Sequence, residues 1–174
     1  MDEQFEKFFN YSIRFLSYRP RSEYEVRQAL IKKKFGKTKP GTEKADSSLE
    51  LFEKIITKLK EQNFLNDTEF TRWWIEQRTK VRPKGLQLIK RELRQKGISQ
   101  DLIEEVLTNK SDELPVGSED QLSIAKQLVQ KRLPRLKGLD HQEQYQKLGQ
   151  FLGRRGFDFD TIRQAIDGVI KKGV

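Results

Sequence analysis

Apolar residues recur at spacings of three and four along most of the chain. The first such group comprises Phe5, Phe8, Phe9, Ile13 and Leu16, and similar groups lie within 49–59, 102–107 and 162–169. This spacing places apolar side chains on one face of an α-helix. We find no convincing run in which apolar and polar residues alternate, as they do in a half-buried strand. The pattern therefore predicts an all-α protein with about nine helices.

Short polar motifs indicate where several of these helices begin. Three pairs have the spacing of a capping box: Ser22 with Glu25, Ser47 with Glu50, and Ser118 with Gln121. Asp67, Ser99 and Asp158 are further candidate caps or first-turn acids. Two stretches lack helical periodicity and are rich in turn-forming residues. We interpret residues 36–48 as a flexible loop and residues 109–118 as a linker.

One segment of the chain recurs three times. The stretches "RSEYEVRQALIKKKF" from Arg21, "KGLQLIKRELRQKGI" from Lys84 and "EQYQKLGQFLGRRGF" from Glu143 align without gaps. The alignment matches Val26 with Ile89 and Leu148, Leu30 with Leu93 and Leu152, and Phe35 with Ile98 and Phe157. Each copy stands between two other expected helices, so the repeat indicates a tandem array of three three-helix modules. We expect these modules to span residues 1–63 (containing the loop 36–48), 64–110 and 111–174 (beginning with the linker).

The composition supports small modules. Apolar residues make up 34% of the chain and charged residues 35%, which is too polar for one large spherical core. Eleven phenylalanines and two tryptophans still supply core material. The absence of cysteine excludes disulfides and thiolate metal sites. We find no apolar run of membrane-spanning length and no signal peptide, so we expect a cytoplasmic protein that makes no contact with membranes.

Residues that could perform catalysis are scarce. His141 is the only histidine, so a histidine-based metal site or a nucleophilic triad lacks partners. The motif "GRRG" at 153–156, which we expect inside a helix, does not match a phosphate-binding loop. Glu104 and Glu105 are adjacent and would point in different directions on a helix. We therefore expect a protein that is not an enzyme and uses neither a cofactor nor a metal ion.

Positive charge is concentrated in the middle of the chain. The net charge is +9, and the segment from Arg78 to Lys96 has eight basic residues but one acid, Glu92. Ordinary helix surfaces mix charges of both signs, so this segment indicates a polyanion or an acidic groove as partner. We predict a binding face built from Arg21, Arg27, Arg78, Lys80, Arg82, Lys84, Lys90, Arg91, Arg94, Lys96, Arg154 and Arg155. For the last two, a favourable interaction with the helix dipole is an alternative explanation.

The stretch "RWWIEQR" at 72–78 allows two interpretations. Aromatic side chains beside arginine can stack on unpaired bases. Phe70, Trp73 and Trp74 also have the spacing of core residues. We expect at least one tryptophan to pack inward, and the role of the other stays open.

Four stretches together resemble the RecX family, whose members modulate the bacterial recombinase RecA. They are "SYRPRSEYEVRQALIKKKF", "KLKEQNFLNDTEFTRWWIEQR", "KGLQLIKRELRQKGISQDLIEEVL" and "FLGRRGFDFDTIRQAI", in the family's order. The resemblance implies an elongated helical array that binds in the groove of the RecA–single-stranded-DNA filament. It also implies inhibition of the recombinase's ATPase and strand-exchange activities, and direct DNA binding by some members.

These observations leave several functional hypotheses. The first is a monomeric, non-enzymatic regulator of the RecA filament that contacts single-stranded DNA, with double-stranded DNA as a second candidate ligand. The alternative is a direct DNA- or RNA-binding protein whose helix–turn–helix-like modules place a helix in a groove. A helical scaffold for an acidic protein is the third.

Overall fold

Helices are the only regular secondary structure in the described part of the chain. The computed structural model describes residues 3–36, 43–109, 114 and 117–170, and these residues contain no strand. Their α-helices are α1 (Glu3–Ser17), α2 (Glu23–Phe35), α3 (Glu43–Glu61), α4 (Asp67–Glu76), α5 (Leu86–Gln95), α6 (Gln100–Thr108), α7 (Ser118–Arg132), α8 (His141–Gly153) and α9 (Phe159–Ile170). A π-helix η1 (Gln77–Val81) extends α4, and a 3₁₀-helix η3 (Leu133–Leu136) extends α7. The prediction of an all-α protein is confirmed.

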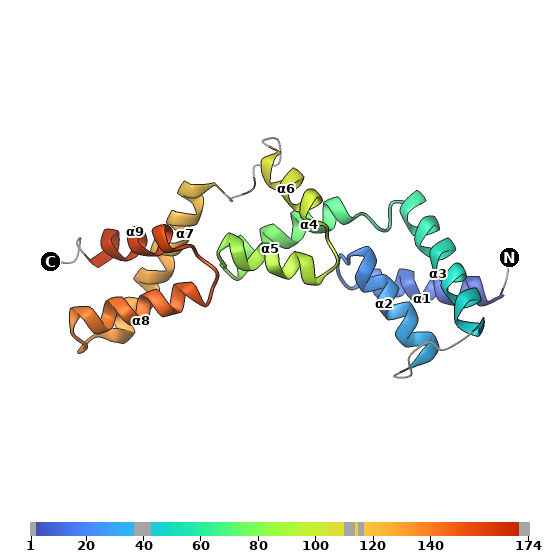
Figure 1. Cartoon of the computed structure of the whole chain (residues 1–174), viewed down its shortest axis with the longest axis horizontal. Helices are drawn as coiled ribbons and strands as arrows, with labels where there is room; N and C mark the ends of the chain where they lie inside the picture. The colour runs from blue at the N-terminus through green and yellow to red at the C-terminus, as the bar shows by residue number, and fades with distance from the viewer. Residues whose placement is uncertain (1–2, 37–42, 110–113, 115–116, 171–174) are drawn as a thin grey trace.

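Three separate cores lie along an elongated molecule (Figure 1). Phe8, Leu30 and Phe52 belong to the core of α1–α3, Phe70, Leu93 and Ile103 to that of α4–α6, and Val129, Leu152 and Ile166 to that of α7–α9. The repeated three-helix unit is therefore confirmed. The boundaries at 63/64 and 110/111 stay a prediction. Two residues that follow these boundaries pack on the preceding module: Leu65 is buried in the first core, and Leu114 packs against the second.

The middle helix of each module is built on the same pattern. Val26, Ile89 and Leu148 are each 0% exposed, as are Leu30, Leu93 and Leu152. These are the positions that the alignment of the three segments matched. In every module, two apolar side chains four residues apart, on successive helical turns, thus point into the core.

The helix starts agree with the sequence in part. The capping box of Ser22 and Glu25 is present, and Ser99 and Asp158 accept hydrogen bonds from first-turn N–H groups. The prediction for Ser47 is wrong because α3 begins at Glu43, so residues 43–48 are helical rather than part of a loop. Residues 37–42 of that expected loop lie outside the described residues. The cap of α7 is Gly117, one residue before Ser118, and Asp120 accepts its N–H.

Three helices end in the same way. After α3, α5 and α8 comes a residue with positive φ: Asn63 (56°), Gly97 (79°) and Gly156 (82°). The N–H of the following residue donates to the carbonyl five positions back, at Leu59, Leu93 and Leu152. This is the Schellman ending, which favours glycine because other side chains are strained at positive φ. The motif "GRRG" therefore forms the end of α8, and the expectation that it lies inside a helix is wrong.

The modules are joined by one repeated contact. Ser22 Oγ donates to Lys96 O at 2.7 Å, and the Gly85 N–H donates to Arg155 O at 2.8 Å. The alignment matches Ser22 with Gly85 and Lys96 with Arg155, so the two junctions use equivalent positions. In both, the start of a middle helix meets the end of the next module's middle helix. As a result α8, α5 and α2 follow one another along the long axis (Figure 1), with their dipoles aligned.

Glu25 adds an electrostatic link between the first two modules. Its carboxylate lies 2.8 Å from both Arg19 and Lys96, and its side chain is only 17% exposed. Burial by itself would raise the pKa of Glu25. The hydrogen bonds and charges of Arg19 and Lys96 outweigh that effect and lower the pKa to about 2.

Glu25→Gln is expected to lower the free energy of unfolding at neutral pH by about 2 kcal/mol, after allowance for the water that reaches the carboxylate. The folded-state pKa lies below the ordinary value of 4.5, so this stabilisation is present above pH 4.5 and lost as the pH falls towards about 2. Urea unfolding of the parent and the variant across this range measures the difference. The exposed Glu105→Gln is the control, and a variant whose pH dependence matched the parent's would refute the link.

Candidate functional site

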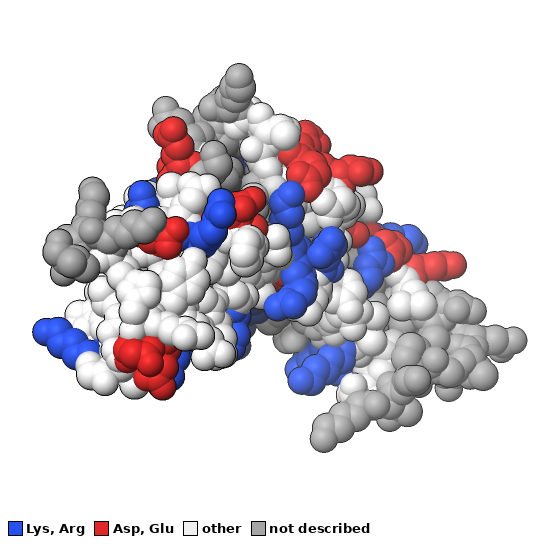
Figure 2. Space-filling view, turned by 60° about the vertical axis from the view of Figure 1, so that its left-hand side comes forward, with Lys and Arg blue, Asp and Glu red and all other residues white. Residues whose placement is uncertain are grey.

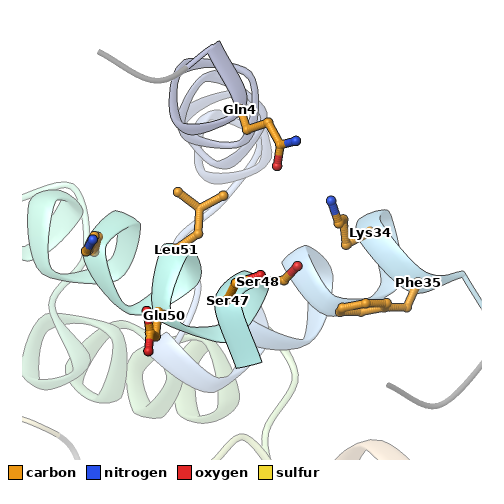
Figure 3. Close-up of a pocket in the computed structure, with 8 residues that line it drawn as sticks. Gln4, Lys34, Phe35, Ser47, Ser48, Glu50 and Leu51 are labelled. Atoms are coloured by element: carbon orange, nitrogen blue, oxygen red, sulfur yellow. The ribbon is translucent and has the colours of Figure 1, made fainter. Parts of the chain in front are cut away.

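One pocket lies among the three helices of the first module. The pocket in Figure 3, with a volume of about 510 Å³, is lined by α1, α2 and α3. Polar side chains in its lining belong to Gln4, Lys34, Ser47, Ser48 and Glu50. Among the residues that the structure describes, no cluster of His, Asp and Glu could hold a metal ion. No helix in those ranges is long and apolar enough to cross a membrane.

Glu92 neutralises part of the predicted basic face. Its carboxylate accepts a hydrogen bond from Arg78 Nε at 2.8 Å and pairs with Lys84. Although burial opposes it, these two cations lower the pKa of Glu92. Trp74 Nε1 donates to the same carboxylate at 3.2 Å. The one acid of the basic segment thus binds two of its cations and a core tryptophan.

Acids outside the basic segment bind four more of the predicted residues. Lys80 pairs with Glu76 at 2.7 Å, Lys90 with Glu104 at 2.7 Å and Lys96 with Glu25 at 2.8 Å. Arg27 pairs with Glu23 at 2.8 Å and with Glu53. Ion pairs at the surface contribute little stability each, but they lower the net charge that a partner meets.

Two predicted arginines lie against aromatic rings. The guanidinium carbon of Arg21 is 4.0 Å from the ring centroid of Phe15, and that of Arg155 is 4.5 Å from Phe151. In each the Nε atom is buried without a hydrogen-bond partner in the described structure. These contacts are cation–π interactions, which leave the outer nitrogens able to donate.

Three exposed arginines of the predicted face meet at the junction of the second and third modules. A groove of about 450 Å³, which we call the arginine groove, is lined by Arg91 and Arg94 on α5 and by Arg154 at the end of α8, together with Lys90. The three arginines are exposed. Arg94 hydrogen-bonds the amide of Gln100 at 3.3 Å, and within the described residues none of these three arginines forms an ion pair. Lys and Arg side chains gather in a band through the middle of the view in Figure 2. Arg82 is also exposed, outside this groove.

The two tryptophans have different positions. Trp74 is 8% exposed, and its ring lies under Arg78 and Lys96, at 4.1 and 4.3 Å. Trp73 is half-buried and lines a second groove between the first two modules. The expectation that at least one tryptophan packs inward is confirmed.

Family models match most of the chain. The first, second and third three-helix domains of RecX match residues 9–37, 66–107 and 119–166. A regulatory protein RecX from Prosthecochloris aestuarii is 34% identical over 169 residues, which are 97% of this chain and 97% of the relative. The chain belongs to the RecX family. The regulatory protein RecX of Bacillus subtilis is 35% identical over 96% of this chain, which spans 56% of that longer relative.

Solved RecX structures have the same fold. The crystal structure of RecX from Lactobacillus salivarius superposes with a TM-score of 0.75 at 22% identity, covering 98% of this chain and 99% of the other. A second crystal structure, of a regulatory protein RecX, gives a TM-score of 0.74 at 25% identity, covering 95% and 74%. The relatives are named as regulatory proteins, so a RecX regulatory role follows for this chain.

The arginine groove also contains residues that the sequence interpretation did not select. Gln87, Leu88, Gly153 and Gly156 line it beside the arginines. Arg154 aligns with Gln95, so the alignment alone gave no reason to group it with Arg91. The three arginines come together only because the end of α8 meets the start of α5.

Proposed function

We propose that this RecX-family chain binds the RecA–single-stranded-DNA filament and inhibits its ATPase and strand-exchange activities. One observation carries the proposal: Arg91, Arg94 and Arg154, from two modules, share an open groove while most other cations of the basic segment are paired. Arginine forks bind phosphate and carboxylate in two-point geometry, so this groove suits either the DNA backbone or acids on the recombinase.

The elongated array suits a filament better than an isolated duplex. A filament presents the same surface at regular intervals, and three modules in a row can contact more than one protomer. Several weak contacts then add through effective concentration, without any single deep pocket. The exposed positive charge also speeds encounter with a polyanion. We propose that the chain acts as a monomer in the cytoplasm.

Comparing bare and RecA-coated single-stranded DNA tests the proposal. We expect the chain to bind the coated DNA at least tenfold more tightly at the same salt concentration, because recombinase contacts add to phosphate contacts. We also expect ATP hydrolysis by the filament to fall as the chain is added. Fluorescence anisotropy with a labelled oligonucleotide measures the first quantity, and phosphate release the second. Equal affinity for both forms would instead support a direct nucleic-acid-binding protein, and unchanged hydrolysis would remove the inhibitory role.

A further inference from the structure

A second groove lies between the first and second modules, apart from the arginine groove. It has a volume of about 640 Å³, and its walls come from the end of α1, the turn after α3 and the exposed side of α4. Its aromatic lining consists of Phe64, Phe70 and Trp73, and Arg19, Arg21 and Glu69 also line it. Aromatic faces beside arginines are the arrangement that binds unpaired bases.

Phe64 is exposed, although a side chain at this position of a Schellman ending normally makes an apolar contact with the helix before it. It follows Asn63 in the Schellman ending of α3, and the residues at the same place after α5 and α8 are Ile98 and Phe157. Those two are 3% and 5% exposed, whereas Phe64 is 52% exposed. Its ring therefore contributes to the groove rather than to a core.

Trp73 is held on the wall formed by α4. Its ring centroid lies 6.0 Å from that of Phe70 and 6.0 Å from that of Trp74, both of which are buried. Packing on these two neighbours fixes the indole while part of it stays accessible. A ring that enters the groove thus meets an indole that is already ordered. Trp73 therefore loses little conformational entropy on binding.

The rim of the groove has a positive balance. Arg21 lies over Phe15, and no acid in the described residues pairs with it. Arg19 shares Glu25 with Lys96, so one carboxylate balances two cations. Glu69 pairs with Arg72 at 2.6 Å. An anionic chain is attracted to this rim, whereas an apolar side chain of a protein gains nothing from the charge.

We propose that this groove holds one unpaired nucleobase of single-stranded DNA, stacked between Trp73 and Phe64, with neighbouring phosphates near Arg19 and Arg21. This inference rests on the proposed function. In it, the groove between the first two modules binds a base, and the arginine groove binds phosphates or carboxylates. Every base has a flat π-surface, so the contact needs no particular sequence.

Abasic DNA separates base stacking from phosphate binding. The full chain is titrated with oligothymidylate and with an abasic oligomer of the same length and charge, following tryptophan fluorescence and anisotropy. We expect roughly tenfold tighter binding to oligothymidylate and quenching of the tryptophan signal, the size of effect that one stacked base gives. Trp73→Leu is expected to lose the quenching and to bind both oligomers alike, with the salt dependence of binding unchanged.

Two exposed phenylalanines provide the matched variants. Phe64→Ser changes a surface side chain and should reduce the preference for bases even if Trp73→Leu fails to fold. Phe159→Ser, at a site 76% exposed in the third module, should leave the preference intact. The inference is wrong if the full chain binds both oligomers equally, or if quenching persists without Trp73. Weakened binding of Trp73→Leu to DNA-free recombinase would mean that the groove takes a protein side chain. These results leave the RecA-filament comparison unaffected, so the two proposals can fail separately.

Discussion

Gly156→Ala is expected to destabilise the junction of the second and third modules by about 2–5 kcal/mol, the larger of the stability effects predicted here. Two costs combine at this position. Gly156 has a φ of 82°, where an L-residue is strained by about 1–2 kcal/mol. A Cβ there would also overlap Leu88, with its backbone nitrogen 2.6 Å away, and overpacking costs about 1–3 kcal/mol. Because a backbone cannot move aside as a flexible side chain does, the junction itself must open.

Two other glycines separate these costs. Gly138 has a φ of 97° but open space around a Cβ, so Gly138→Ala carries the backbone strain alone. Gly85 has an ordinary φ of −71°, but a Cβ there would overlap the backbone of Gly156 and Phe157, so Gly85→Ala carries the overlap alone. Urea unfolding measures each loss, and small-angle X-ray scattering reports whether the array bends. We expect Gly85→Ala and Gly156→Ala to change the radius of gyration and Gly138→Ala to preserve it. A Gly156→Ala protein that unfolds like Gly138→Ala would show that the contact with Leu88 contributes nothing.

The periodic positions could be predicted from the sequence because burial follows helical spacing. Val26, Ile89 and Leu148 were matched by alignment alone, and all are fully buried. The start of α3 could not be predicted in the same way. Residues 43–48 have Ala45 as their one apolar residue and so lack an apolar stripe. Their helical state depends on continuing a helix whose apolar face begins further along, at Leu49.

The charge of the basic segment was counted correctly, but its neutralisation was not foreseen. Of the cations between Arg78 and Lys96, only Arg78 and Lys84 meet the segment's own acid, Glu92. The partners of Lys90 and Lys96 are Glu104, which is 14 residues away, and Glu25, which is 71 residues away. A local sum of charges cannot include acids that tertiary packing brings near. The exposed, unpaired charge is therefore smaller than the sum, and Arg91 and Arg94 place part of it at a module junction, beside Arg154.

Changing Arg91, Arg94 and Arg154 together to glutamate is expected to weaken binding to the RecA–single-stranded-DNA filament by about two orders of magnitude or more at physiological salt. All three side chains are exposed, and no ion pair within the described structure depends on them, so helicity by circular dichroism should stay the same. If the groove contacts three phosphates, the slope of log affinity against log salt should fall by about 2 units. If the groove instead meets acids on the recombinase, affinity should fall on coated DNA while binding to bare DNA keeps its slope.

Net charge needs its own control, because the triple variant lowers the formal charge from +9 to +3, two units for each substitution. Lys131, Arg135 and Lys137 are exposed around the end of α7 and outside the arginine groove, and their replacement by glutamate gives the same total. We expect this control to lose less than about fivefold in affinity, since distant exposed charges are largely screened at physiological salt. Equal losses in the two variants would mean that the filament responds to the overall positive charge, and the groove would have no special role. A loss confined to the first variant would place the binding energy at the junction where the end of α8 meets α5, the same contact that depends on Gly156.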